Sequence, residues 1–197
     1  CQAVLIGPGL GREESSINAV CDLIEKLVES NIPLVIDADA IRALPSHAWP
    51  MGMVGVVTPH STEMEHWLGA SDPVEVLQIR ARRDGISRVV EDESCVIVRT
   101  GAEDELWAPG GRHCFAIGGH ARMSVGGTGD LLSGCIAGLL AQGMSPWAAA
   151  RLGCALMRTA GASAALEYGP GLSASDVPLH IARTLASWTG QETDRES

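Results

Sequence analysis

The sequence is short of positive charge. It has 14 Lys and Arg residues against 24 Asp and Glu residues, which gives a formal net charge of -10 over 197 residues. A protein that binds nucleic-acid phosphates or an anionic membrane surface needs a basic face, so this balance argues against both partners. It does not exclude a small phosphate ligand, because glycine-rich loops and helix N-termini hold phosphate locally whatever the global charge.

Charged residues of either sign are also few. They make up 19% of the chain, whereas hydrophobic residues make up 46%, and this ratio excludes a disordered chain. The length fits one domain of roughly 100–200 residues. We expect one domain over residues 1–188 and a polar tail over residues 189–197.

Closely spaced cysteine pairs are missing. The six cysteines lie at positions 1, 21, 95, 114, 135 and 154, so there is no CxxC motif and no zinc-type pairing. Several lie in apolar runs, where a reduced and buried thiol is the usual state. This usage is typical of an intracellular protein, and we expect a cytoplasmic location.

No segment has the pattern of a signal peptide or a membrane span. Residues 131–150 carry no formal charge, but Gly143-Met144-Ser145-Pro146 within them is typical of one helix ending and another beginning. We expect two buried helices there. The chain begins with Cys1-Gln2-Ala3, which is neither a Met nor a basic leader, and residues 3–6 are typical of an interior strand. We therefore expect further chain before residue 1.

Short apolar runs alternate with amphipathic segments. We expect strands over residues 3–6, 33–36, 54–57 and 95–98, a hairpin over 106–108 and 113–117, and helices over 13–30, 63–68, 73–90, 131–142, 146–167 and 176–187. Uniformly apolar strands that alternate with helices favour a parallel sheet covered on both faces. The sequence predicts a doubly wound α/β domain.

Ligands of such a fold bind beyond the carboxyl ends of the strands. Polar or glycine-rich segments follow the expected strands at residues 7–11, 37–39, 58–63, 99–104 and 126–130. Five such segments at one edge of a sheet are hard to explain by turn chemistry alone.

The motif Gly126-Gly127-Thr128-Gly129-Asp130 carries the sharpest signal. Its glycines allow a ligand to approach the backbone, and the helix that follows presents free N–H groups and a positive dipole end to phosphate. Asp130 is a candidate general base for a substrate hydroxyl. The alternative is that Asp130 only caps a helix and the glycines only form a turn. No Lys-Ser/Thr follows, so this is not a P-loop.

The segment Thr58-Pro59-His60-Ser61-Thr62-Glu63 admits two interpretations. His60 and Glu63 stand three residues apart just past a strand, where they could bind substrate or hold Mg²⁺ through the carboxylate and waters. The alternative is a helix cap at Ser61 or Thr62, with Glu63 in the first turn.

Two further segments are ambiguous in the same way. Gly7-Pro8-Gly9-Leu10-Gly11 is either a ligand-binding loop or a tight turn, and it is not the dinucleotide fingerprint, because Arg12 stands where a third glycine is needed. Asp37 and Asp39 could both reach the edge of the sheet, or one of them could cap the next helix.

Taken together and in order, these motifs resemble those of the ADP/ATP-dependent NAD(P)H-hydrate dehydratases, which have a ribokinase-like fold. The likeness covers most of residues 3–180 and includes the segments 7–11, 35–40, 57–64, 125–143, 160–161 and 171–176. It implies a three-layer domain and a lyase of metabolite repair. In this family, ADP or ATP phosphorylates the ring hydroxyl of hydrated NADH or NADPH (NADHX or NADPHX), and elimination of phosphate restores the dihydronicotinamide. Mg²⁺ is required.

The resemblance also implies roles for individual residues. Asp130 matches the base that acts on the hydroxyl and contacts the substrate, and His60 matches the histidine that contacts the hydrated dinucleotide. The glycines of the first loop, Gly9 and Gly11, line the same pocket. Glu63 falls where related sugar kinases carry a Mg²⁺-linked acid. The nucleotide-binding residues are Thr100, Gly101, Ala102, Glu103, Asp104, Gly127, Thr128 and Gly129.

The chain departs from the family pattern at several places, of which two bear most on function. The usual Leu-Lys-Gly after the fourth strand is replaced by Val98-Arg99-Thr100-Gly101, and Glu103 and Asp104 add negative charge where phosphates are expected. Family members also have strands and helices before the first glycine loop, so we expect this domain to lack its N-terminal strands and helices.

Family membership implies partners as well. Some members carry an N-terminal NAD(P)H-hydrate epimerase domain, so a fused or separate epimerase is expected, as is a homo-oligomer such as a tetramer. Two other functions stay open. One is a ribokinase-like kinase of a small hydroxylated vitamin precursor or sugar, with Asp130 in the same role. The other is a nucleotide-binding remnant without catalysis.

Overall fold

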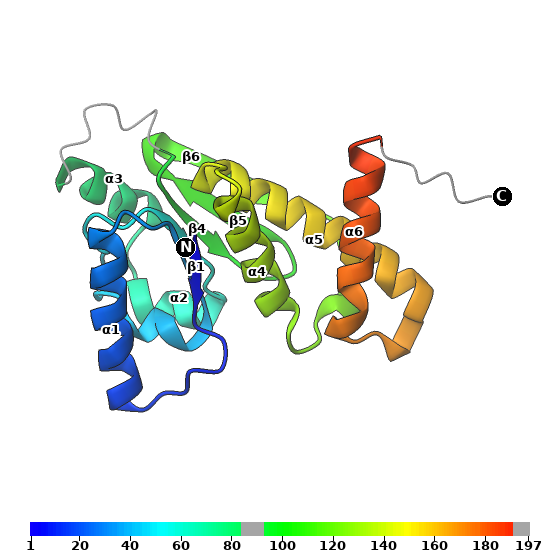
Figure 1. The fold of residues 1–197 in the computed structure, drawn as a ribbon, viewed down its shortest axis with the longest axis horizontal. Coiled ribbons are helices and arrows are strands. Elements are labelled where there is room, and N and C mark those ends of the chain that lie inside the picture. Colours follow the sequence, from blue (N-terminus) through cyan, green and yellow to red (C-terminus); the bar gives the residue numbers. More distant parts are fainter. Residues whose placement is uncertain (84–92, 191–197) are drawn as a thin grey trace.

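A six-stranded sheet forms the centre of the molecule (Figure 1), as seen in a computed structural model that describes residues 1–83 and 93–190. The strands are β1 (Val4–Ile6), β2 (Leu34–Ile36), β3 (Gly55–Val57), β4 (Cys95–Arg99), β5 (Asp104–Ala108) and β6 (Arg112–Ala116), and they are ordered in space as they are in sequence. Strands β1 to β4 are parallel, whereas β5 and β6 each run antiparallel to the strand before. The sheet is therefore mixed, with the expected hairpin at one side.

Helices cover both faces of this sheet. They are α1 (Glu14–Glu29), α2 (Ser61–Leu68), α3 (Pro73–Arg83), α4 (Thr128–Ala141), α5 (Pro146–Tyr168) and α6 (Val177–Trp188). One face packs against α1, α2, α3 and the short 3-10 helix Ala38–Ala43, and the other packs against α4 and α5. Helix α6 lies mainly against α5 (Figure 1). This arrangement confirms the three-layer α/β domain.

Neighbouring residues of the parallel strands serve opposite cores, which explains their uniformly apolar sequence. On β2, Leu34 and Ile36 pack into the core shared with α1 and α2, whereas Val35 packs into the core shared with α4 and α5. All three side chains are fully buried. A strand covered on both faces has no side chains that face solvent, so its sequence does not alternate between apolar and polar residues.

The two helices expected within residues 131–150 are present. Helix α4 begins at Thr128, three residues earlier than predicted, and Ser145 caps α5 by accepting a hydrogen bond from the Ala148 N–H at 3.3 Å. In the described part of the chain, no helix is long and apolar enough to cross a membrane. The helix predicted over 73–90 is seen as Pro73–Arg83, and residues 84–90 lie outside the described residues.

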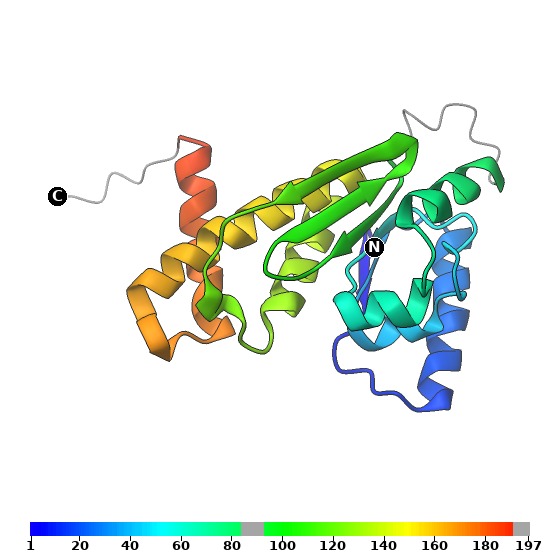
Figure 2. The same cartoon turned by 180° about the vertical axis from the view of Figure 1, so that it is seen from behind.

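The direction of β6 decides where the glycine motif lies. Because β5 runs opposite to β4 and β6 opposite to β5, β6 ends at the same edge of the sheet as β1 to β4. Figure 2 shows these last strands lying along α5. The connection from β6 to α4 therefore starts beside the loops that follow the parallel strands.

Candidate active site

The loop after β1 is held by the segment after β2. Gly7 has a φ of 148°, and a Cβ at this position would overlap the Asp37 carbonyl oxygen, so only glycine fits. The Gly11 N–H donates to Asp39 Oδ2 and Arg12 Nε to Asp39 Oδ1, each at 3.1 Å. Asp39 therefore anchors the loop that carries Gly9 and Gly11, both of which are exposed.

His60 caps α2, one residue before the predicted cap. Its Nδ1 accepts hydrogen bonds from the N–H groups of Thr62 at 3.1 Å and Glu63 at 3.3 Å. The cap predicted at Ser61 or Thr62 is thus wrong, because an unprotonated imidazole nitrogen reaches the same amides that an Asn or Ser side chain would.

Glu63 completes this cap and fixes the histidine tautomer. Glu63 Oε2 accepts from the His60 N–H at 3.0 Å, and Oε1 lies 3.3 Å from His60 Nε2. Since Nδ1 acts only as an acceptor, the proton of the neutral ring is on Nε2. The His60 side chain is still 56% exposed, so the ring can contact a ligand while it caps the helix.

The start of α4 presents free backbone amides. Gly127 precedes the helix with a φ of 92°, a conformation that favours glycine, and none of the described side chains caps this end. The Thr128 hydroxyl donates to the carbonyls of Met123 at 3.0 Å and Val125 at 2.9 Å, which folds the preceding loop onto the helix. An uncapped N-terminus suits an anion.

Asp130 lies in the first turn of α4, exposed and near a second carboxylate. That carboxylate is Asp37, whose side chain is buried and caps the 3-10 helix by accepting from the Ala38 N–H at 2.9 Å. Burial raises the pKa of Asp37, and the charge of Asp130 raises it further, against opposing interactions with Ser133, Thr58 and the Ala38 amide. Of the two alternatives for Asp37, the structure shows the cap.

The loop between β4 and β5 adjoins His60. The Thr100 N–H donates to the Pro59 carbonyl at 2.9 Å, and Thr100 forms an isolated parallel bridge with His60. Glu103 is exposed in this loop, whereas Asp104 is buried. The negative charge expected from Asp104 is neutralised, because Arg158 of α5 binds both of its oxygens, at 2.7 and 2.9 Å.

Arg99 is also occupied. It forms an ion pair with Glu105, and its guanidinium lies 5.8 Å from the centre of the Trp107 ring. Sequence reasoning missed Arg158, whose only signal was a basic residue within a mainly apolar helix.

Two cavities meet at His60. One, of about 620 Å³, is lined by Thr100, Gly101, Ala102, Asp104, Gly118, Gly119, Thr128, Gly129 and Arg158, among others. The other, of about 550 Å³, is lined by Arg12, Ala38, Asp39, Arg42, Glu63 and His66, among others. His60 lines both. Asp130 itself is among the lining residues of neither cavity. It follows Gly129 of the first cavity in sequence and interacts electrostatically with Asp37, the neighbour of Ala38 in the second.

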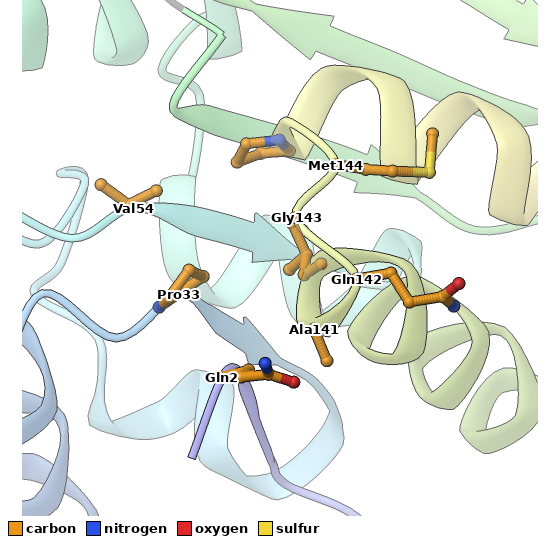
Figure 3. A pocket seen from close by; sticks show the side chains of 9 residues that line it. Gln2, Pro33, Val54, Ala141, Gln142, Gly143 and Met144 are labelled. Carbon is orange, nitrogen blue, oxygen red and sulfur yellow. The ribbon is translucent and has the colours of Figure 1, made fainter.

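A third cavity, of about 790 Å³, lies at the opposite end of the strands (Figure 3). Its described lining comes from the starts of the strands and from the α4–α5 connection, and includes Gln2, Pro33, Val54, Gln142 and Met144. These residues are uncharged, and none belongs to the five motifs. The candidate site is therefore the pair of cavities that meet at His60.

The described residues contain no group of three or more His, Cys, Asp or Glu side chains that could hold a metal ion. This geometry is compatible with Mg²⁺, which commonly binds through one or two carboxylates, substrate phosphates and waters. Glu63 lines the second cavity with a quarter of its side chain exposed.

The site geometry can be compared with known proteins. A sequence model of the NAD(P)H-hydrate dehydratase family matches residues 1–183. The bifunctional NAD(P)H-hydrate repair enzyme Nnr of Methanopyrus kandleri is 30% identical over 191 residues, which are 95% of this chain and 36% of the relative. The ADP-dependent (S)-NAD(P)H-hydrate dehydratase of Haloterrigena turkmenica is 34% identical, over 93% of this chain and 63% of the relative.

Solved structures agree on the fold. The ADP/ATP-dependent NAD(P)H-hydrate dehydratase of Bacillus subtilis, co-crystallized with ATP/Mg²⁺, has a TM-score of 0.73 at 24% identity, over 95% of this chain and 65% of that chain. A ribokinase-like superfamily protein of Enterococcus faecalis has a TM-score of 0.72 at 23% identity, over 95% of this chain and 64% of that chain. The chain thus spans only part of the relatives and solved structures it matches. On the match over residues 1–183, the chain belongs to the NAD(P)H-hydrate dehydratase family.

Proposed function

We propose that the protein carrying this chain converts hydrated NADH or NADPH back to NAD(P)H, with an adenine nucleotide as phosphoryl donor. The observation that carries the proposal is the pair of cavities that meet at His60, with the uncapped N-terminus of α4 lining the first and Asp130 in the first turn of that helix. Phosphoryl transfer needs two ligands held end to end, a base and an anion site, and it depends mainly on positioning and charge stabilisation.

The first cavity suits the nucleotide. Asp104 and Arg158, which line this cavity, are paired with each other. The wall formed by residues 100–102 and Gly118 therefore carries no net charge, which favours the base and sugar of the nucleotide. The first turn of α4 at Gly129 and the dipole of this helix adjoin the same cavity and favour the transferred phosphoryl group. Relatives named ADP-dependent support ADP as the donor.

The second cavity suits the hydrated dinucleotide. His60 and the loop of Gly9 and Gly11 border it, through Arg12 and Asp39. In our proposal Asp130 accepts the proton of the ring hydroxyl as the oxygen bonds to the phosphoryl group and the bond to the nucleotide breaks. The ring C–O bond then breaks, phosphate leaves with its electron pair, and the adjacent ring carbon loses a proton.

Mg²⁺ fits this proposal as a further cofactor. Each oxygen of Glu63 has one interaction within the helix cap, to the His60 backbone N–H and to Nε2 respectively, so lone pairs stay available for a metal-bound water. A bound Mg²⁺ would neutralise phosphate charge at the junction of the cavities.

Three further properties extend the proposal. The dehydratase domain occupies residues 1–188 with a polar tail after it, the protein forms a homo-oligomer, and it acts beside a fused or separate NAD(P)H-hydrate epimerase. The bifunctional names of several relatives support the last of these. Neither cavity is basic overall, which agrees with a small-molecule substrate rather than nucleic acid.

An absorbance assay tests the proposed function. The longest natural chain that contains these residues is incubated with NADHX or NADPHX, Mg²⁺ and either ADP or ATP, and absorbance is followed at 340 nm, where the dihydronicotinamide absorbs. A nucleotide-dependent rise is expected, and the faster nucleotide identifies the donor. A stable phosphomonoester with no rise would contradict the proposal and favour a ribokinase-like kinase of a vitamin precursor or sugar.

A further inference from the structure

Arg158 is a buried cation in the middle of α5. Its side chain is only 9% exposed, and the other buried residues of this helix are small or apolar. Burying a guanidinium is costly unless its charge is paired and each donor has an acceptor. The partners of Arg158 therefore indicate why the residue is there.

All five N–H donors of Arg158 have acceptors. Nε and Nη2 bind the two oxygens of Asp104 at 2.9 and 2.7 Å, and Nη2 also donates to the Gly101 carbonyl at 3.1 Å. Nη1 donates to the carbonyls of Ala102 at 2.6 Å and Gly118 at 2.9 Å. With every donor used inside the protein, Arg158 has no N–H left for a ligand.

These acceptors belong to two separate walls of the 620 Å³ cavity. Gly101 and Ala102 lie between β4 and β5, and Asp104 is the first residue of β5, whereas Gly118 lies in the connection from β6 to α4. The pairing of β5 with β6 ends at Asp104 and Ala116. The carbonyls of Gly101, Ala102 and Gly118 therefore lie beyond this pairing, and the guanidinium fork bridges them. The fit is close, because a Cβ on Gly119 would lie 3.4 Å from Arg158 Nη1.

Arg158 also changes the charge of the cavity. Asp104 lines this cavity, and an unpaired carboxylate there would repel the phosphates of a nucleotide. Arg99, the basic residue at the end of β4, is paired with Glu105 instead of Asp104. Neutralisation of Asp104 thus depends on a residue 54 positions away in the sequence.

We propose that Arg158 is a positioning residue of the nucleotide site. It holds the two backbone walls at the spacing that an adenine nucleotide requires, and it cancels the negative charge of Asp104. The inference rests on the proposed function, because it takes the 620 Å³ cavity as the nucleotide site.

The test is R158K in the longest natural chain. Lysine keeps a positive charge beside Asp104, but its single ammonium cannot replace a planar fork that reaches both walls. Losing charge-assisted hydrogen bonds is expected to raise the KM and the Kd for ADP about tenfold or more. The KM for the hydrated dinucleotide and kcat are expected to stay within about twofold, since Arg158 contacts neither the second cavity nor Asp130.

Two further variants serve as controls for R158K. R183K makes the same chemical change on α6, where Arg183 pairs with Glu167 away from both cavities, and it should leave all constants unchanged. D104N/R158Q removes the ion pair without stranding a buried charge. It should weaken ADP binding even if R158K does not fold.

Calorimetric titration with ADP alone separates this inference from the proposed function. If R158K binds ADP more weakly than wild type, the inference is upheld. If, in addition, the wild-type protein gives no rise in absorbance at 340 nm, the dehydratase proposal is overturned while the inference stands. R158K or the double variant binding ADP as tightly as wild type would overturn the inference. An equal loss of affinity for ADP and for the hydrated dinucleotide in R158K would also overturn the inference, because it would indicate a general structural role for Arg158. Wild-type protein that binds no adenine nucleotide would overturn both.

Discussion

Gly161→Ala tests how α5 supports the proposed nucleotide site. Gly161 is buried in α5, and a Cβ there would overlap the end of the Met123 side chain and lie 3.0 Å from its Cγ. Met123 precedes the glycine motif, and its carbonyl accepts the Thr128 hydroxyl at 3.0 Å. The new methyl group therefore pushes on the segment that starts α4.

Two opposing terms set the size of the effect. Replacing glycine by alanine within a helix favours folding by about 1 kcal/mol. Overpacking a closely packed site costs about 1–3 kcal/mol. The net expectation is a loss of about 0–2 kcal/mol in the free energy of unfolding. In a Met123→Ala background the overlap disappears, so the same change should stabilise by up to about 1 kcal/mol.

The assay is a double-mutant cycle followed by urea unfolding and tryptophan fluorescence. The expected coupling energy is about 1–3 kcal/mol between Gly161→Ala and Met123→Ala. Gly138→Ala in α4 is the matched control, because a Cβ there meets nothing within 4 Å among the described residues. Equal effects of Gly161→Ala in both backgrounds would refute the packing argument, and an unchanged KM for ADP would refute its link to the site.

Other predictions concern the carboxylates. Asp130→Asn should lower kcat about 10²–10⁴-fold in the 340 nm assay while ADP still binds, and near-normal kcat would exclude it as the base. Glu63→Gln keeps the capping box but loses charge, so it should raise the Mg²⁺ concentration needed for half-maximal rate, and an unchanged titration would leave Glu63 only as a cap. The pKa of Asp37 is raised in the folded protein, so ionisation of this carboxyl destabilises the folded state. The protonated Asp37 therefore stabilises the fold fully at pH values below its pKa in the unfolded chain, and this stabilisation is lost as pH rises through its pKa in the folded protein. The free energy of unfolding of Asp37→Asn, measured by unfolding titrations, should therefore rise relative to that of wild type as the pH goes from acid to neutral. A difference between the two free energies that does not change with pH would contradict the raised pKa of Asp37.

The layers of the fold were predictable because burial leaves a direct mark on sequence. The run Leu34–Ile36 is apolar at every position since both of its faces are covered, and Ser145-Pro146 is a standard helix start. The start of α4 was placed too late, because Thr128 and Gly129 have poor helix propensity that tertiary contacts override.

The site was predictable in its backbone motifs but not in its side-chain pairs. The expected loops do meet at one edge of the sheet, since strand direction alone brings them there. The partnership of Arg158 with Asp104 spans 54 residues and depends on how α5 crosses the sheet. The His60 cap depends on a tautomer that its neighbours select. Neither has a local sequence signal.

The even number of strands in the hairpin of β5 and β6 decides at which end of the sheet the chain emerges. The hairpin adds two reversals of chain direction between β4 and α4, so the chain returns to the edge it left. Losing a single strand would deliver the glycine motif to the opposite end of the sheet, whereas lengthening both strands equally would not move it. The exposed Gly110 at the hairpin turn is consequently a place where extra residues or a label can be inserted far from the edge that carries the candidate site.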